Sequence, residues 1–177
     1  MDLYDVINAR RSIRKYTDRS VPRETVEKIL NAGRLAPSWK NRQCWRIVLV
    51  SDPELKRQMG MVVDNPSAEL YATAPYILVL CADPTDSGSM SGKDYYMVDC
   101  GICMEHIVLA ATAEGLGTCW VGYFPENPLK NLLGIPRDTR IVALSPLGYP
   151  AEAPEARPRQ PLENMLYENT WLPTGRN

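Results

Sequence analysis

Two groups of basic side chains are the residues of this sequence best suited to chemistry. The first is Arg10-Arg11-Ser12-Ile13-Arg14-Lys15-Tyr16, where four cations and one hydroxyl fall within six positions. Packing does not account for them, because guanidinium and ammonium groups are almost never buried unpaired. An arginine fork fits phosphate oxygens through two hydrogen bonds, and a serine beside it adds another, so the stretch can bind an anion. A solvated basic loop is the alternative, and this stretch alone does not choose between them.

The second group is Arg157 and Arg159, which stand two residues apart in a proline-containing tail. If this segment is extended, the two side chains can point the same way. Should the two basic groups converge, they would form a site for a dianionic phosphate. The alternative is two solvated arginines, and the spacing does not exclude it.

Three further patterns suggest chemistry less strongly. Cys100-Gly101-Ile102-Cys103 has the spacing of a thiol-redox or metal site, but the chain has one histidine and no second cysteine pair. We therefore expect structural cysteines and no metal site, with a thiol-redox role as the alternative. His106 has no neighbours that would complete a catalytic triad. Gly115-Leu116-Gly117 lacks the third glycine and the preceding strand of a dinucleotide-binding fingerprint, so we interpret it as the end of a helix.

The composition predicts one globular domain over residues 1–177. The chain is 45% hydrophobic and 23% charged, with a net charge of −1, so its overall charge does not point to nucleic acid or to an anionic membrane. The N-terminus lacks the form of a signal peptide, which makes the cytoplasm the expected compartment. Five cysteines in mostly apolar surroundings favour free buried thiols in a reducing compartment.

Hydrophobic periodicity predicts an α+β fold that positions these groups. The apolar run 76–81 predicts a central strand covered on both faces, and the nearly all-apolar run 95–114 predicts a long helix at the centre of the domain. A polar loop containing Trp39 occupies residues 35–43, and residues 83–93 are expected to be a flexible loop. Further helices are expected at 2–9, 21–33, 53–61, 68–73 and 127–133, and further strands at 45–50, 118–121 and 140–147.

Taken in order, these motifs resemble those of the FMN-dependent nitroreductase family. The matching segments are residues 10–16, 36–45, 115–122, 148–150, 157–159 and 161–163, which together span most of the chain. The resemblance implies a central, mostly antiparallel sheet of about four to five strands flanked by helices. It also implies an intertwined homodimer with FMN bound at the subunit interface.

The resemblance implies a cofactor-binding role for each of the following residues. Arg10, Ser12, Arg157 and Arg159 would hold the FMN phosphate, and Arg14 would lie near N1 and O2 of the isoalloxazine ring. Arg11 belongs to the same set without an assigned contact. Pro37, Ser38 and Asn41 would come from the partner subunit, and backbone groups of Val121 and Gly122 would face the ring near N5.

The activity implied is that of an NAD(P)H-dependent FMN oxidoreductase acting on nitroaromatics, quinones or similar acceptors. NAD(P)H would pass a hydride to flavin N5 and leave, and the acceptor would use the same pocket in a ping-pong scheme. No protein nucleophile is needed, and a fixed cation near N1 would stabilise the reduced flavin. The alternatives are reductive dehalogenation, an oxidative biosynthetic step, or a flavin-binding redox sensor without catalysis. No nucleic acid or membrane partner is expected.

Overall fold

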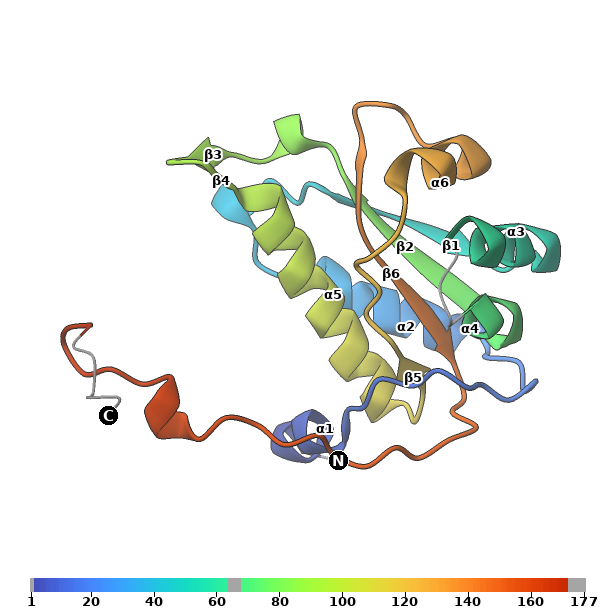
Figure 1. Ribbon diagram of the computed structural model, residues 1–177, viewed down its shortest axis with the longest axis horizontal. Coiled ribbons are helices and arrows are strands. Elements are labelled where there is room, and N and C mark those ends of the chain that lie inside the picture. The colour runs from blue at the N-terminus through green and yellow to red at the C-terminus, as the bar shows by residue number, and fades with distance from the viewer. Residues whose placement is uncertain (1, 64–67, 172–177) are drawn as a thin grey trace.

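The centre of the protein is a four-stranded antiparallel sheet, seen in a computed structural model that describes residues 2–63 and 68–171 (Figure 1). The strand order is β1 (Trp45–Val50), β2 (Tyr76–Ala82), β6 (Arg140–Gly148) and β5 (Gly117–Thr118). Every neighbouring pair is antiparallel. The predicted α+β fold with an antiparallel central sheet is confirmed, and β2 is a central strand as its apolar run predicted.

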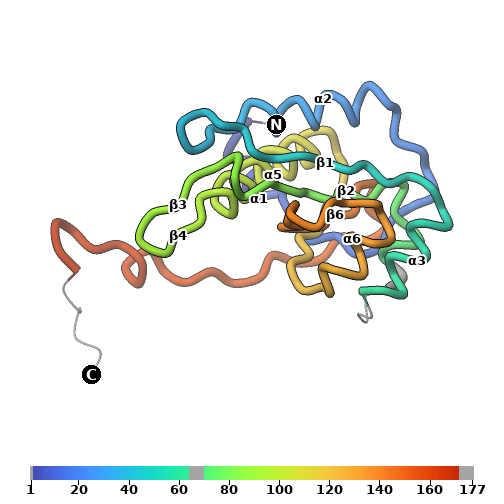
Figure 2. The backbone as a smooth tube through the Cα atoms, turned by 90° about the horizontal axis from the view of Figure 1, so that it is seen from above, coloured from blue at the N-terminus to red at the C-terminus, as the bar shows by residue number. Residues whose placement is uncertain are grey.

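Helices cover both faces of this sheet. On one face lie α2 (Arg23–Arg34) and α5 (Tyr95–Ala113), and on the other lie α3 (Pro53–Val63), α4 (Ala68–Thr73) and α6 (Glu126–Leu133) (Figure 2). Even-numbered β2 residues from 78 to 82 belong to the first core cluster and odd-numbered ones from 77 to 81 to the second. Both sets are buried because successive side chains of a strand point to opposite faces.

Helix α5 covers the same face of the sheet as α2 and packs closely against it. A Cβ added to Gly33 of α2 would lie 2.6 Å from Cγ1 of Ile107, so glycine permits this approach. α5 is long and apolar enough to cross a bilayer, but the core helix of a globular protein meets the same two criteria. Here α5 packs on α2 and the sheet. It is less enclosed than its sequence predicted, since Met97 and Val98 keep 49% and 53% of their surface exposed.

The connecting segments differ from expectation in two places. The expected loop at 83–93 contains a 3-10 turn, η2 (Pro84–Asp86), and a small hairpin of β3 (Ser89–Met90) and β4 (Lys93–Asp94). In place of the strand expected at 118–121, the structure has the two-residue strand β5 (Gly117–Thr118). Val121, the last residue of the expected strand, makes only an isolated bridge to Leu144 of β6. The remaining short elements are α1 (Leu3–Ala9), η1 (Trp39–Asn41) and η3 (Leu162–Asn164), the last in a tail that runs away from the body (Figure 1).

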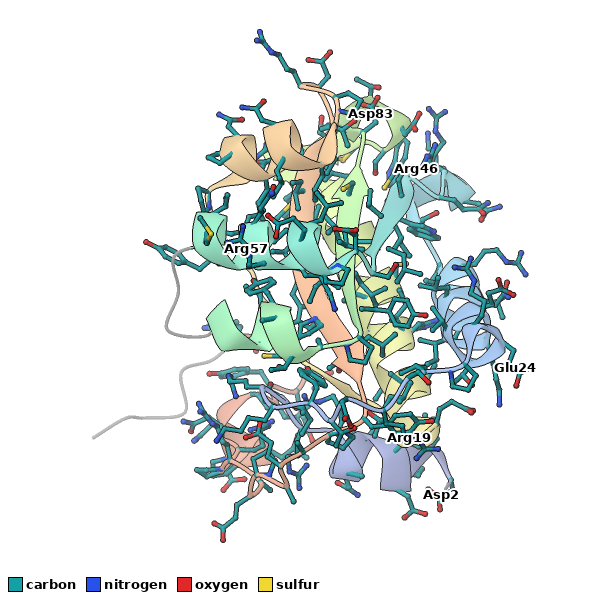
Figure 3. All side chains as sticks on the ribbon, turned by 90° about the vertical axis from the view of Figure 1, so that its right-hand side faces the viewer. Asp2, Arg19, Glu24, Arg46, Arg57 and Asp83 are labelled. Atoms are coloured by element: carbon teal, nitrogen blue, oxygen red, sulfur yellow. The ribbon has the colours of Figure 1, made fainter. Side chains whose placement is uncertain are left out.

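Most charged side chains away from the tail lie at the surface, among them Glu24, Arg46 and Arg57, which Figure 3 labels, whereas Lys56, Asp99 and Lys130 are buried. Many of them are paired: within the described residues Arg57 contacts Glu54 at 2.6 Å, and Arg46 contacts Asp86 at 3.1 Å. Such exposed pairs contribute little to stability. They matter here as a contrast, because the arginines near the tail are not paired in this way.

Candidate functional site

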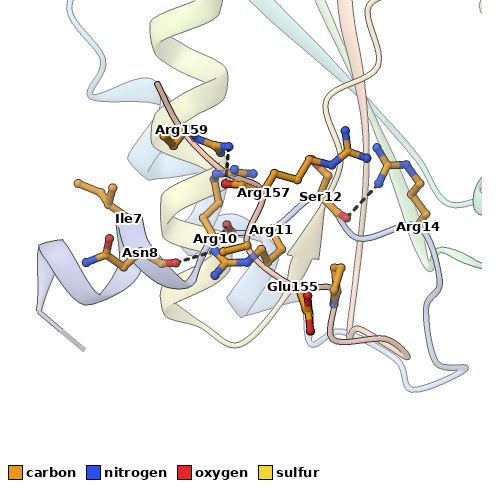
Figure 4. A pocket seen from close by; sticks show the side chains of 11 residues that line it. Ile7, Asn8, Arg10, Arg11, Ser12, Arg14, Glu155, Arg157 and Arg159 are labelled. Carbon is orange, nitrogen blue, oxygen red and sulfur yellow. Dashed lines mark hydrogen bonds between the residues drawn. The ribbon is translucent and has the colours of Figure 1, made fainter. Parts of the chain in front are cut away.

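The two basic groups found in the sequence meet in one hollow of about 400 Å³ (Figure 4). Its N-terminal side is lined by Arg10, Arg11, Ser12 and Arg14, and its C-terminal side by Arg157 and Arg159. Residues almost 150 positions apart in the chain therefore face a common space. The convergence that a phosphate site requires is present within a single chain.

The hollow is strongly positive. Among the ion pairs of the described residues, none involves the five arginines that line it. Glu155 also lines the hollow and likewise forms no ion pair within the described chain. The five arginines outnumber this one carboxylate, so their guanidinium groups repel one another, and a bound anion would relieve that repulsion.

The basic stretch is held in place on one side by β5. Ser12 forms a parallel bridge with Thr118, and the Ile13 N–H donates to the Thr118 carbonyl at 2.8 Å. Gly117 permits this contact, because a Cβ there would lie 2.7 Å from Cγ1 of Ile13. The stretch is thus an extended edge segment of the sheet with a fixed register, which alternates buried Ile13 with the polar residues on either side.

On its other side the stretch is held by the start of the tail. The Glu152 carboxylate accepts hydrogen bonds from the backbone N–H groups of Arg14, at 2.5 Å, and Lys15, at 3.2 Å. The Ala151 N–H donates to the Lys15 carbonyl at 2.9 Å. These bonds tie the segment that carries Arg157 and Arg159 to the segment that carries Arg14, so the two walls of the hollow are positioned together.

The arginines differ in how far the chain already engages them. Arg11 donates from Nη1 to the carbonyls of Asn8, at 2.6 Å, and Arg10, at 2.8 Å, which satisfies carbonyls at the end of α1. Arg14 donates to the Ser12 carbonyl at 3.3 Å, and Arg159 donates to the Arg157 carbonyl at 3.1 Å. No hydrogen bond from the Arg10 side chain is found within the described residues, which leaves its guanidinium available to an anion. A cofactor contact for Arg11 remains a prediction.

The loop that carries Pro37, Ser38 and Asn41 lies at the other end of α5. The Trp39 N–H donates to Asp99 near the start of α5 at 2.8 Å, and the Trp39 ring stacks on Tyr95 with centroids 6.3 Å apart. The basic stretch instead pairs with β5, which follows the end of α5. The 19 residues of α5 correspond to a length of about 28 Å. One chain therefore does not bring the two parts of the predicted set together.

This loop has an unusual backbone. Lys40, Asn41 and Gln43 have positive φ angles of 48°, 56° and 51°. Each such conformation costs about 1–3 kcal/mol for a residue other than glycine, and such residues cluster at functional sites. The Gln43 N–H donates to the Ser38 hydroxyl oxygen at 2.9 Å, which supports the turn from within.

Of the two residues predicted to contact the flavin through their backbone groups, Val121 and Gly122, the structure favours Gly122. Both backbone groups of Val121 pair with Leu144, each at 2.9 Å, so they are already used within the sheet. At Gly122, an added Cβ would meet no atom within 4 Å among the described residues. The contact near flavin N5 remains a prediction, and it now rests on Gly122.

The five cysteines are free and buried, as the sequence predicted. Burial raises the pKa of the Cys103 thiol to about 12 and that of Cys100 further still. Both thiols are protonated at neutral pH, which disfavours the thiol-redox alternative. Within the described residues, no group of three or more His, Cys, Asp or Glu side chains is placed to hold a metal ion.

Sequence reasoning missed two acids that organise the site. Glu152 fixes the basic stretch, and Asp99 binds the loop at the opposite end of α5. Asp99 interrupts a nearly all-apolar helical run, and Glu152 begins the proline-containing tail, but neither context indicates a partner. Their partners lie 138 and 60 positions away in the chain, so local sequence could not have indicated them.

The sequence model of the Nitroreductase family matches residues 7–149 of this chain. The chain belongs to the nitroreductase family. A solved nitroreductase family protein from Clostridium novyi NT is 41% identical, with a TM-score of 0.83 over 89% of each chain. The match to the family model ends before Arg157 and Arg159. The structure places both arginines in the hollow beside residues 10–14, and their contact with the cofactor stays a prediction.

Three relatives illustrate the activities found within this family. A protein of Thermus thermophilus named NADH dehydrogenase is 32% identical, over 89% of this chain and 91% of its own length. An FMN reductase [NAD(P)H] of Bacillus subtilis is 29% identical, over 92% of this chain and 71% of its own length. An iodotyrosine deiodinase of Haliscomenobacter hydrossis is 26% identical, over 85% of this chain and 80% of its own length.

Proposed function

We propose that this chain is an FMN-dependent oxidoreductase that uses NAD(P)H to reduce nitroaromatics, quinones or similar small acceptors. The observation that carries the proposal is the hollow in which unpaired arginines from both ends of the chain converge with Ser12. Relatives named FMN reductase [NAD(P)H] and NADH dehydrogenase support the choice of flavin and of electron donor.

The side chains fit the phosphate end of FMN. Arg10, Arg157 and Arg159 supply positive charge and Ser12 supplies a hydroxyl, which are the groups that bind phosphate oxygens through charge-assisted hydrogen bonds. We assign these four residues to the phosphate, with Arg11 lining the same hollow and supporting the end of α1.

Arg14 is the residue that we assign to the redox end of the site. When bound, FMN would supply the hydride and electron transfer that the protein itself lacks. Arg14 is held by its own backbone bond to Glu152 and by its guanidinium bond to the Ser12 carbonyl. A cation fixed in this way stabilises negative charge that develops beside it and needs little reorganisation during the reaction. Near flavin N5, Gly122 has no side chain and would leave room for the isoalloxazine ring.

The complete site would require two copies of this chain in a homodimer. Apolar side chains are exposed on α1, on the outer face of α5 and along the tail, among them Tyr4 at 75%, Val98 at 53% and Trp171 at 80%. If two α5 helices pack antiparallel about a twofold axis, the start of each lies near the end of the other. Pro37, Ser38 and Asn41 of one chain would then reach the arginine hollow of its partner, and residues 1–177 would act as one flavin-binding domain.

We also place the protein in the cytoplasm. NAD(P)H is an intracellular reductant, and the free state of all five cysteines fits a reducing compartment.

Anaerobic titration of the purified protein tests this function. After incubation with FMN, the protein should retain flavin through gel filtration, and NADH or NADPH should bleach the visible flavin absorbance. Adding a nitroaromatic or a quinone should restore the absorbance repeatedly. A protein that retains no flavin, or whose flavin neither nicotinamide reduces, would contradict the proposal.

Reductive dehalogenation is a second candidate, favoured by the similarity to iodotyrosine deiodinases. The two candidates share the flavin site and differ in the final acceptor. A panel containing nitroaromatics, quinones and halogenated phenols separates them, because only dehalogenation releases halide ions. Halide release without reduction of nitro compounds or quinones would favour the second candidate.

A further inference from the structure

Asp99 is a buried carboxylate with an uncommon set of partners. It lies in α5 with 3% of its surface exposed. Its Oδ1 accepts the Trp39 N–H at 2.8 Å, and its Oδ2 accepts the Ser87 hydroxyl at 2.9 Å and the Cys44 thiol at 3.6 Å. No ion pair to Asp99 occurs within the described chain. A buried carboxylate without a cation is costly unless hydrogen bonds compensate for its lost hydration.

Two of these donors bracket the strained part of the loop. Trp39 immediately precedes Lys40, the first of the residues with positive φ, and Cys44 immediately follows Gln43, the last of them. A single carboxylate therefore holds both ends of a segment whose backbone conformation is unfavourable by itself. Bonds within the loop, such as Gln43 N–H to Ser38 Oγ at 2.9 Å, also support the turn, whereas Asp99 ties both of its ends to α5.

The third donor joins the loop to the segment before the β3–β4 hairpin. Next to Ser87, Gly88 lies directly against the Trp39 ring, where a Cβ would be 2.6 Å from the indole. On another side the ring stacks on Tyr95. The indole thus contacts both the hairpin segment and α5, and the backbone N–H of Trp39 donates to Asp99.

The protonation state of Cys44 agrees with this arrangement. Burial, together with the neighbouring Asp99, raises the pKa of the Cys44 thiol to about 11. The thiol therefore keeps its proton at neutral pH and can donate it to Asp99. Three donors, the Trp39 backbone N–H, the Ser87 hydroxyl and the Cys44 thiol, thus converge on the two side-chain oxygens of Asp99.

We propose that Asp99 is a positioning residue for the flavin site, because it fixes the loop that presents Pro37, Ser38 and Asn41 to the cofactor. The inference rests on the proposed function for the identity of the ligand. It does not require Asp99 to touch the flavin or the substrate. Asp99 acts through the loop, and in the dimer it acts on the site of the partner subunit.

The test compares full-length Asp99→Asn and Ser87→Ala variants with wild type. Asparagine keeps one oxygen for the Trp39 N–H but places a donor where Ser87 and Cys44 also donate. Leu129→Ala in α6 is the matched control, since it removes a fully buried side chain on the opposite face of the sheet. Hydrogen–deuterium exchange at residues 38–44 without cofactor, and FMN affinity, are measured for each protein.

For Asp99→Asn we expect faster exchange at residues 38–44 and FMN binding weakened by about 10- to 100-fold, the range for lost hydrogen bonds to a charged group. Ser87→Ala should show the same two changes with smaller size. Leu129→Ala should lower the melting temperature and leave both readouts as in wild type. If Asp99→Asn does not fold, Ser87→Ala carries the test.

Two results would overturn the proposal. Unchanged exchange at residues 38–44 would show that Asp99 does not hold the loop, whether or not FMN binds. Faster exchange with wild-type FMN affinity would show that the loop does not serve the cofactor. Failure of the wild-type protein to bind FMN would instead overturn the proposed function, so the two failures are distinguishable.

Discussion

Replacing Arg159 with alanine should weaken FMN binding specifically through the phosphate. Arg159 lines the hollow, forms no ion pair within the described chain, and is bonded only to nearby carbonyls of the tail. A hydrogen bond to a charged group contributes about 1.5–3 kcal/mol. Arg159 is exposed, and solvent screening places its contribution at the lower end. We therefore expect about a tenfold loss of affinity, which corresponds to about 1.4 kcal/mol.

The assay measures FMN and riboflavin binding side by side by quenching of flavin fluorescence. Riboflavin lacks the phosphate, so its affinity should be the same for wild type and Arg159→Ala. Added salt should reduce the difference between the two proteins for FMN, because screening weakens exposed charge interactions. Arg23→Ala is the control for loss of charge alone, since Arg23 is an exposed residue of α2 paired with Glu27.

Two outcomes would refute this reasoning. An unchanged FMN affinity would show that the tail arginine is not a phosphate ligand. An equal loss for riboflavin and FMN would show that Arg159 supports the site as a whole and does not bind the phosphate.

Three other predictions follow from particular contacts. Arg14→Gln should lower the midpoint potential of bound FMN by about 30–60 mV, where 30 mV corresponds to about 1.4 kcal/mol for two electrons; an unchanged potential would place Arg14 away from the redox end. Burial opposes ionisation of Glu126, but hydrogen bonds, chiefly from Arg140, outweigh it and lower its pKa to about 2. This stabilisation is therefore present above pH 4.5, the ordinary value, and lost as the pH falls toward 2. Between pH 6 and pH 3, the free energy of unfolding measured in urea should fall by about 1–2 kcal/mol more for wild type than for Glu126→Gln. Equal decreases in the two proteins would contradict the assignment. Gly33→Ala should lower the free energy of unfolding by about 1–3 kcal/mol, since its Cβ would clash with Ile107; an unaltered denaturation midpoint would show that α2 can shift without cost.

Much of the fold could be predicted because its determinants are local. The apolar run of β2 indicated a strand covered on both faces, and the nearly all-apolar segment before Gly115 indicated the extent of α5. The hairpin at 89–94 was missed because its strands have only two residues each, which is too short for periodicity to indicate them.

The site was predictable where residue type alone limits the chemistry. Clustered arginines indicated an anion site, and the structure brings both clusters to one hollow. The pairing of Val121 with Leu144 depends on the register between distant segments, which the local sequence does not specify. The left-handed conformations at Lys40 and Asn41 could not be predicted either, because no glycine marks them.

The most direct test of the account is a mixed dimer. One chain would carry Arg10→Ala and Arg159→Ala, and the other would carry Ser38→Ala and Asn41→Ala, with different tags so that the mixed species can be isolated.

Each parent homodimer should lose tight FMN binding, because each has one defective part in both sites. If each site combines the arginine hollow of one chain with the loop of the other, the mixed dimer contains one intact site and one doubly defective site. It should then bind one FMN per dimer with wild-type affinity. A mixed dimer that binds FMN no better than its parents would contradict the shared site.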